Sequence, residues 1–202
     1  MFNFDLGFKT ENINLIAGVD EAGRGPLAGP VCVAAVIMPL EQNKIISGVN
    51  DSKKLTEKKR EALFDEITNT ALAYKIEFVS EKEIDRVNIL NATKQGMKQA
   101  ICGLNTKPDL VLIDAVKLDG INVPQVSIIK GDAKSYNIAA ASILAKVTRD
   151  RLMLELDKKY PEYNFKKHKG YGTKEHIENL KKFGKCEIHR DSFIKNFVGG
   201  NE

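Results

Sequence analysis

Cysteine is scarce in this chain of 202 residues, and long apolar runs are missing. The three cysteines stand singly, as Cys32, Cys102 and Cys186, so they form neither a disulfide framework nor a Cys-x-x-Cys metal site. No apolar stretch approaches the ~20 residues of a membrane-spanning helix. The N-terminus lacks the basic and apolar segments of a signal peptide. We therefore expect a cytoplasmic protein that makes no contact with a membrane.

Metal-ligand spacing is also missing from the three histidines, which weakens any zinc hypothesis. We expect His176 to be solvated on a helix among polar neighbours and His189 to be structural, while His168 is a candidate for a phosphate contact. The net charge of +4 is too mild to indicate nucleic-acid binding by itself. Between positions 158 and 185, however, basic residues outnumber acids and aromatic residues are interleaved with them, a pattern typical of a nucleic-acid surface.

Short apolar segments bounded by glycine and proline alternate with segments of helical spacing. Strands are expected at 15–20, 31–37, 71–79, 110–114 and 122–129. Helices are expected at 56–70, 80–104 (two pieces meeting near Asn88), 135–160 and 173–183. This order predicts an α/β core of mixed strand direction. Because repeats and linkers are missing, we expect one structural unit with a core of residues 1–160 and a C-terminal helical extension of residues 161–202.

Acidic residues stand where predicted strands end. Asp20 and Glu21 close the first strand, Asp114 closes the strand 110–114, and Asp132 stands in a glycine turn just after the next strand. Crowded, buried carboxylates repel one another and lose hydration, and a cation offsets both effects. One such aspartate alone would indicate a turn or a helix cap. The set of four predicts a site for Mg²⁺ or Mn²⁺, where two ions could promote hydrolysis of a phosphodiester.

The acid pair runs directly into Gly23, Arg24 and Gly25. Glycines let backbone amides approach a phosphate, and an arginine fork can grip one. The segment also matches the GxGxxA pattern of dinucleotide-binding proteins, but that pattern requires a helix at its end. Here Gly29, Pro30 and a predicted strand follow at once, so the dinucleotide interpretation is rejected.

Two further loops carry candidate substrate contacts. Ser52 and Lys53 precede the helix 56–70 and could hold a backbone phosphate, the alternative being a flexible charged loop. Tyr171 stands between two glycines beside several cations. There its ring could stack on a sugar or sense a 2′-hydroxyl, the alternative being an ordinary surface tyrosine.

Taken together, these residues resemble the ribonuclease HII family, the type 2 ribonucleases H. The resemblance covers nearly all of the chain, with its motifs in the family's order. The motifs are VDEAGRGP at 19–26, DSKKL at 51–55, LID at 112–114, KGD at 130–132, AASILAKVTRD at 140–150 and HKGYGT at 168–173. Two small departures are Ala115, where the family has glycine, and Gly131, where it has alanine.

The resemblance implies a ribonuclease H-like fold, a mixed central sheet flanked by helices, with a C-terminal helical extension that contributes to substrate binding. It implies an endonuclease that cleaves the RNA strand of RNA·DNA hybrids and single ribonucleotides embedded in duplex DNA. Cleavage 5′ of the ribonucleotide would leave 5′-phosphate and 3′-hydroxyl ends. The carboxylates that hold Mg²⁺ or Mn²⁺ would be Asp20, Glu21, Asp114 and Asp132.

The same resemblance assigns substrate contacts. The backbone around the ribonucleotide would be bound by Gly23, Arg24 and Gly25, the junction with deoxyribonucleotide would be sensed by Tyr171, and Lys53 would contact a phosphate.

Two rivals remain at this point, a ribonuclease HIII-type nuclease and a non-catalytic hybrid-binding protein. The HIII type carries an extra N-terminal domain, whereas this chain reaches its first acid at position 20, and the second rival predicts degraded carboxylates. We expect a monomer. Residues 196–202 give a weak hint of a sliding-clamp peptide, but Phe193 and Phe197 are expected to pack against the body of the protein.

Overall fold

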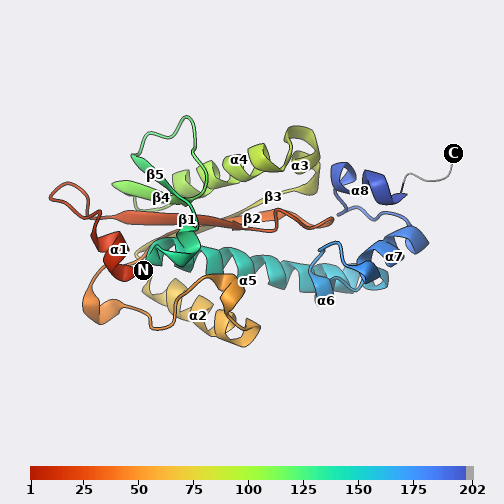
Figure 1. Cartoon of the computed structure of the whole chain (residues 1–202), viewed down its shortest axis with the longest axis horizontal. Helices are drawn as coiled ribbons and strands as arrows, with labels where there is room; N and C mark the ends of the chain where they lie inside the picture. The colour runs from red at the N-terminus through yellow and green to blue at the C-terminus, as the bar shows by residue number, and fades with distance from the viewer. Residues whose placement is uncertain (199–202) are drawn as a thin grey trace.

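A five-stranded sheet of mixed direction forms the centre of the computed structural model, which describes residues 1–198 (Figure 1). The strands lie in the order β3-β2-β1-β4-β5. β1 and β2 pair antiparallel, as do β2 and β3, whereas β4 runs parallel to both β1 and β5. The strand bounds are Ile16–Ala22 for β1, Val31–Ile37 for β2, Ala73–Val79 for β3, Leu110–Asp114 for β4 and Gln125–Ile128 for β5.

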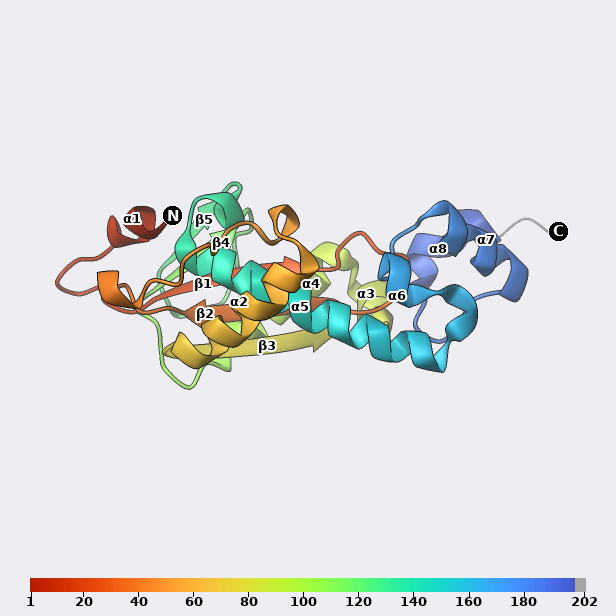
Figure 2. The ribbon, with the colours of Figure 1, turned by 90° about the horizontal axis from the view of Figure 1, so that it is seen from below.

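Helices cover both faces of this sheet. The longer elements are α2 (Glu57–Thr70), α3 (Glu81–Val87), α4 (Ile89–Cys102), α5 (Tyr136–Lys159), α7 (Lys174–Phe183) and α8 (Asp191–Val198). The short ones are α1 (Phe2–Leu6), α6 (Phe165–His168), and the 3₁₀ turns η1 (Gln42–Lys44), η2 (Ser52–Lys54), η3 (Gly131–Ala133) and η4 (Pro161–Tyr163). α3 and α4 lie on one face, α2 and α5 on the other, and α6, α7 and α8 gather at one end (Figures 1 and 2). Within the described residues, none of the helices has the length and apolar character needed to cross a membrane.

Several helices begin at residues whose side chains cap the helix N-terminus. Thr56 accepts a hydrogen bond from the Lys59 amide at the start of α2, and Ser135 accepts one from Ile138 at the start of α5. Asn88 lies at φ +67° and caps α4, so the segment 80–104 forms two helices as expected. Such caps satisfy amides that a helix leaves without an internal partner.

Three strands differ in their bounds from the sequence expectation. The strand expected at 71–79 begins at Ala73, because Ala71 still caps the end of α2. β1 continues to Ala22, because its pairing with β2 extends to Cys32, so the acid pair lies inside a strand rather than at its end. The strand expected at 122–129 is shorter, since β5 pairs with β4 over four residues, from Gln125 to Ile128.

The long helix α5 packs closely on β1 through a glycine. A Cβ atom on Gly18 would lie 2.1 Å from the carbonyl carbon of Asn137 and 2.3 Å from the Ile138 nitrogen. Asp5 accepts hydrogen bonds from the backbone and side-chain nitrogens of Asn137, and Asn137 accepts one from the Met38 amide. These contacts fix the start of α5 under the sheet, and its 24 residues then reach the C-terminal helices (Figure 2).

The C-terminal helices pack against the core through a small apolar cluster. Phe193 and Phe197 contact the cluster of Leu27, Leu180 and Ile194, which confirms the packing expected for both phenylalanines. Of the segment considered as a clamp peptide, residues 199–202 lie outside the described part of the chain.

Candidate active site

Three aspartates meet at one edge of the sheet. Asp20 in β1, Asp114 at the end of β4 and Asp132 in η3 each offer a carboxylate oxygen, and these oxygens all lie within 4.8 Å of one another. The parallel register explains the first two, since Val19 pairs with Ile113 and the next residues in each strand are the acids. Asp20 is only 5% exposed. The convergence expected from the sequence is therefore present for these three residues.

Glu21 lies beside this group. Successive side chains of a strand point to opposite faces, and the Glu21 carboxylate contacts the Arg24 guanidinium at 3.5 Å. Its backbone amide donates a hydrogen bond to Asp20 Oδ1 at 2.7 Å. Glu21 thus links the three aspartates to the segment of residues 23–30, here called the glycine loop.

The acids lie in surroundings that disfavour negative charge. Burial raises the pKa of Asp20 well above its usual value, and the charges of Glu21 and Asp114 add to the rise. Burial also raises the pKa of Glu21, against the opposing effect of Arg24. The pKa of Asp114 is raised by burial, although the Gly131 amide donates to its Oδ1 at 2.6 Å. A divalent cation would offset this crowding of charge, and an all-carboxylate donor set fits Mg²⁺ or Mn²⁺.

The two departures from the family motifs flank Asp114. Ala115 lies at φ +51°, the left-handed region that glycine adopts without strain. Gly131 lies on the other side, where a Cβ atom would be 2.6 Å from Ile138 Cδ1 and 3.3 Å from Asp114 Oδ1. Glycine at position 131 lets its own backbone amide approach the Asp114 carboxylate. Alanine at position 115, by contrast, has a strained backbone conformation.

Lys53 reaches the carboxylates, but Ser52 does not face the same space. The Lys53 ammonium lies 3.5 Å from Asp132 Oδ2, and its side chain is 81% exposed. It lines a cavity of about 480 Å³ together with Asp114 and Asp132. Burial lowers the pKa of Lys53, but the facing carboxylates raise it and the net shift is upward. Ser52 is 6% exposed, and its amide donates to Ser142 Oγ, so it anchors the loop.

The glycine loop and the tyrosine loop meet. Arg24 and Gly25 are exposed, and a Cβ atom on Gly25 would lie 3.8 Å from Cε1 of Tyr171. The Tyr171 side chain remains 43% exposed. The Leu27 amide donates to the Gly170 carbonyl at 2.8 Å, which ties the two loops together. The structure therefore brings Tyr171 next to the loop that continues from Asp20 and Glu21.

The expectation for His176 was wrong. Its side chain is fully buried, because the segment that carries His189 covers it. The Cys186 amide donates to His189 Nδ1, which leaves the proton of His189 on Nε2, facing His176 Nε2 at 3.1 Å. His176 Nδ1 then donates to the Tyr171 carbonyl. His189 is structural as expected, and this chain of hydrogen bonds holds the tyrosine loop.

His168 is buried as well and does not offer its ring to solvent. Its Nε2 contacts the Tyr163 carbonyl at 2.9 Å, and its Nδ1 accepts from the Gly170 amide. Sequence reasoning also missed Arg190, which lies beneath the glycine loop. No side-chain pattern could have marked it, because its partners there are backbone carbonyl groups.

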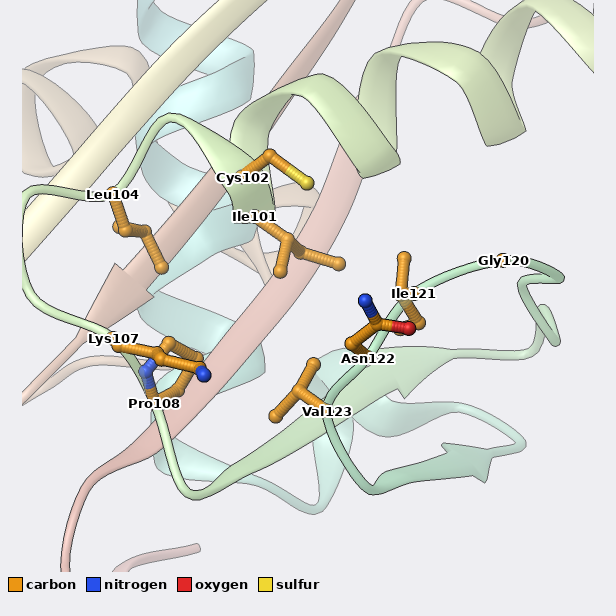
Figure 3. Close-up of a pocket in the computed structure, with 9 residues that line it drawn as sticks. All are labelled: Ile101, Cys102, Leu104, Lys107, Pro108, Gly120, Ile121, Asn122 and Val123. Atoms are coloured by element: carbon orange, nitrogen blue, oxygen red, sulfur yellow. The ribbon is translucent and has the colours of Figure 1, made fainter.

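Figure 3 shows a second cavity, of about 410 Å³, between the end of α4 and the loop that leads to β5. Its lining residues are Ile101, Cys102, Leu104, Lys107, Pro108, Gly120, Ile121, Asn122 and Val123. The candidate site residues described above do not line it.

Comparisons with known proteins agree with the geometry. The family model for ribonuclease HII matches residues 17–196. A ribonuclease HII of Acetivibrio thermocellus is 64% identical over 195 residues, which cover 96% of this chain and 73% of the relative. The crystal structure of ribonuclease H2 from Pyrococcus horikoshii OT3 matches with a TM-score of 0.77 and 30% identity, over 92% of this chain and 97% of that one.

A chain of the PCNA:RNase HII complex from Archaeoglobus fulgidus matches with a TM-score of 0.76 and 28% identity, over 93% of this chain and 98% of that chain. These matches agree with the mixed sheet, the flanking helices and the C-terminal helices described above. The chain therefore belongs to the ribonuclease HII family and is a ribonuclease H endonuclease.

Proposed function

We propose that this chain cleaves the RNA strand of RNA·DNA hybrids and single ribonucleotides embedded in duplex DNA. Cleavage occurs at the phosphodiester 5′ of the ribonucleotide and leaves 5′-phosphate and 3′-hydroxyl ends. One observation carries the proposal: the carboxylates of Asp20 and Glu21 are followed by a glycine loop in which Arg24 and Gly25 are exposed and Gly25 lies against Tyr171. The same turn thus serves cleavage and recognition.

The carboxylates of Asp20, Asp114 and Asp132, with Glu21 beside them, would hold two Mg²⁺ or Mn²⁺ ions. Ribonucleases H depend on divalent metal ions, and the closely spaced oxygens fit that requirement. Two such ions, when bound, supply activation of the attacking water and stabilisation of the leaving oxygen. The Gly131 amide orients Asp114 and the Glu21 amide orients Asp20, so the protein fixes the donor atoms in advance.

Substrate recognition would fall to the loops around this cluster. The backbone of residues 23–25 binds the ribonucleotide and its flanking phosphate, while the Tyr171 ring stacks at the junction with deoxyribonucleotide. Lys53 contacts a phosphate at the rim of the cavity. The extension of residues 161–202 supports the duplex with its lysines, and the biological role would be removal of ribonucleotides from DNA in the cytoplasm.

The experiment that tests the proposal is the substitution Asp20→Asn. Asparagine keeps the shape of the side chain and removes the charge that a cation requires. Cleavage of an RNA·DNA hybrid in Mg²⁺ should fall by roughly a hundredfold or more, while hybrid binding and the unfolding transition persist. A variant that cuts at the parental rate would show that Asp20 does not hold the metal, and loss of hybrid binding by the folded variant would contradict the separation of roles.

Contact with a sliding clamp stays a prediction for this chain, and so does the monomeric state. Sedimentation of the protein alone and with a clamp tests both. A single species of 22.4 kDa is expected for the protein alone, and a sedimenting dimer would contradict the monomer.

A further inference from the structure

Two arginines, Arg149 of α5 and Arg190 just before α8, are buried at the junction of the core and the C-terminal helices. Within residues 1–198, neither guanidinium lies within 4.0 Å of a carboxylate oxygen. Burial accordingly lowers the pKa of both groups. A buried cation without an ionic partner requires other compensation, and here backbone carbonyl oxygens provide it.

Arg190 donates to three carbonyl groups of one loop. Its Nε and one terminal nitrogen donate to Gly29, and its terminal nitrogens also donate to Arg24 at 3.0 Å and to Gly23 at 2.6 Å. Because the Arg190 side chain has no exposed surface, these carbonyl groups point into the protein.

The direction of a carbonyl group fixes the direction of the next amide. A trans peptide is planar and directs its C=O and N–H to opposite sides, and the described residues contain no cis peptide bond. With the carbonyls of Gly23 and Arg24 turned inward, the amides of Arg24 and Gly25 are turned away from Arg190. Both residues are exposed, and in the described part of the chain neither amide has a hydrogen-bond partner.

We propose that Arg190 is a positioning residue that holds the loop carbonyls inward and thereby presents the Arg24 and Gly25 amides to the ribonucleotide. The proposal rests on the proposed function and deepens it, because it names the side chain that sets the direction of the recognising amides. Two fixed N–H groups suit the oxygen atoms of a 2′-hydroxyl and its neighbouring phosphate.

Arg149 packs directly against Gly23 of the same loop. A Cβ atom on Gly23, whose φ is +95°, would lie 2.1 Å from Arg149 Nε, so only glycine leaves room for the guanidinium. Arg149 donates to the carbonyls of Ala28, Pro30 and Lys169. It thereby joins the glycine loop to the loop that carries Tyr171.

A merely structural role for Arg190 makes a different prediction. The Arg190 amide donates to the Leu27 carbonyl, and its guanidinium lies 5.1 Å from the centroid of the Phe193 ring. If the residue only fastened the C-terminal helices to the core, its replacement would weaken binding of every duplex equally. The positioning role requires a loss that depends on the ribonucleotide.

The test compares two duplexes in a protein that cannot cut them. Asp20→Asn and Asp20→Asn/Arg190→Lys are titrated with a duplex carrying one ribonucleotide and with the matched all-DNA duplex, in Mg²⁺. Lysine keeps the charge but cannot bridge three carbonyls. We expect the ratio of the two affinities to fall about tenfold, as the loss of two amide contacts implies, while the all-DNA affinity stays within about twofold. An unchanged ratio, or an equal loss on both duplexes, would overturn the proposal.

Arg151→Lys is the matched control, because Arg151 is partly exposed and pairs with Glu61. It should leave the ratio unchanged. If the Arg190→Lys protein does not fold, the amide NMR signals of Arg24 and Gly25 in the Asp20→Asn protein decide. These two amide signals should shift when the ribonucleotide-containing duplex is added and should not shift when the all-DNA duplex is added. Signals that respond equally to the two duplexes, or to neither, would overturn the proposal. Failure of the proposed function is seen in a different measurement, because the parental protein would then not cleave the ribonucleotide-containing duplex.

Discussion

Single residues around Asp114 determine how the carboxylate cluster is held. Ala115 follows the acid in a left-handed conformation, and Gly131 donates to the acid from the next turn. The sequence marked both positions as departures from the family pattern, yet it could not show that they face the same carboxylate. That contact depends on the parallel pairing of β4 and β5, which places Asp114 opposite Ile128.

Ala115→Gly should stabilise the protein. Alanine at φ +51° is strained. Glycine removes that strain, and this gain should outweigh the cost of the greater conformational entropy that glycine gives the unfolded chain. We expect the free energy of unfolding to rise by up to about 1 kcal/mol, measured by denaturant titration with the metal removed by chelation. Gly120→Ala is the reverse control and should destabilise, because it places alanine at φ +72°, where the new Cβ atom meets only an ordinary contact at 3.8 Å from Lys98 Nζ. A loss of stability on Ala115→Gly would contradict the strain.

At the scale of elements, the sequence predicted most helices and strands because their signals are local. Thr56, Ser135 and Thr173 each cap the helix that follows them. The burial of His176 was not predictable in this way. Its helix carries polar neighbours, and the cover comes from the separate segment around His189.

The buried histidine pair should make stability depend on pH. Burial lowers the pKa of His176 and of His189 to about 4, from 6.5 for an ordinary histidine. Between these values the unfolded chain binds more protons than the folded one, so stability is present above about pH 6.5 and lost as the pH falls toward about 4.

The raised pKa values of the site carboxylates act in the opposite direction, so a variant must isolate the histidine contribution. The parental protein should lose about 2 kcal/mol more than His189→Gln between pH 7 and pH 5, measured by denaturant titration at both pH values. Equal losses in the two proteins would exclude the histidine pair as the source.

At the scale of the whole molecule, the site is assembled from parts far apart in the chain. Strands β1 and β4 supply two acids, η3 supplies the third, and the C-terminal extension supplies Tyr171 and the arginine under the glycine loop. The fold class was predictable because segments with strand and helix patterns alternate along the chain. The loop contacts of Arg190 were not, since they span more than 160 residues and end on backbone oxygens.

Lys53 should contribute to affinity without contributing to discrimination. It lies at the rim of the cavity with its ammonium near Asp132, and a phosphate contact carries no information on the sugar. Lys53→Ala should weaken binding of ribonucleotide and all-DNA duplexes by similar factors. It should also reduce the slope of log affinity against log salt by about 1. Lys44→Ala, which removes the lysine paired with Glu41, serves as the control. A loss confined to the ribonucleotide duplex would contradict this role.

The central claim is that the carboxylate cluster and the ribonucleotide-recognising loop form one site. Its most direct test is cleavage of an end-labelled DNA duplex that contains a single ribonucleotide, in Mg²⁺ or Mn²⁺. We predict one cut, 5′ of the ribonucleotide, with a 3′-hydroxyl on the upstream fragment and no cleavage of the matched all-DNA duplex. A ribonuclease HIII-type activity would cut this substrate poorly, and a hybrid-binding protein not at all. Cleavage at another bond, or of the all-DNA duplex, or none, would contradict the account.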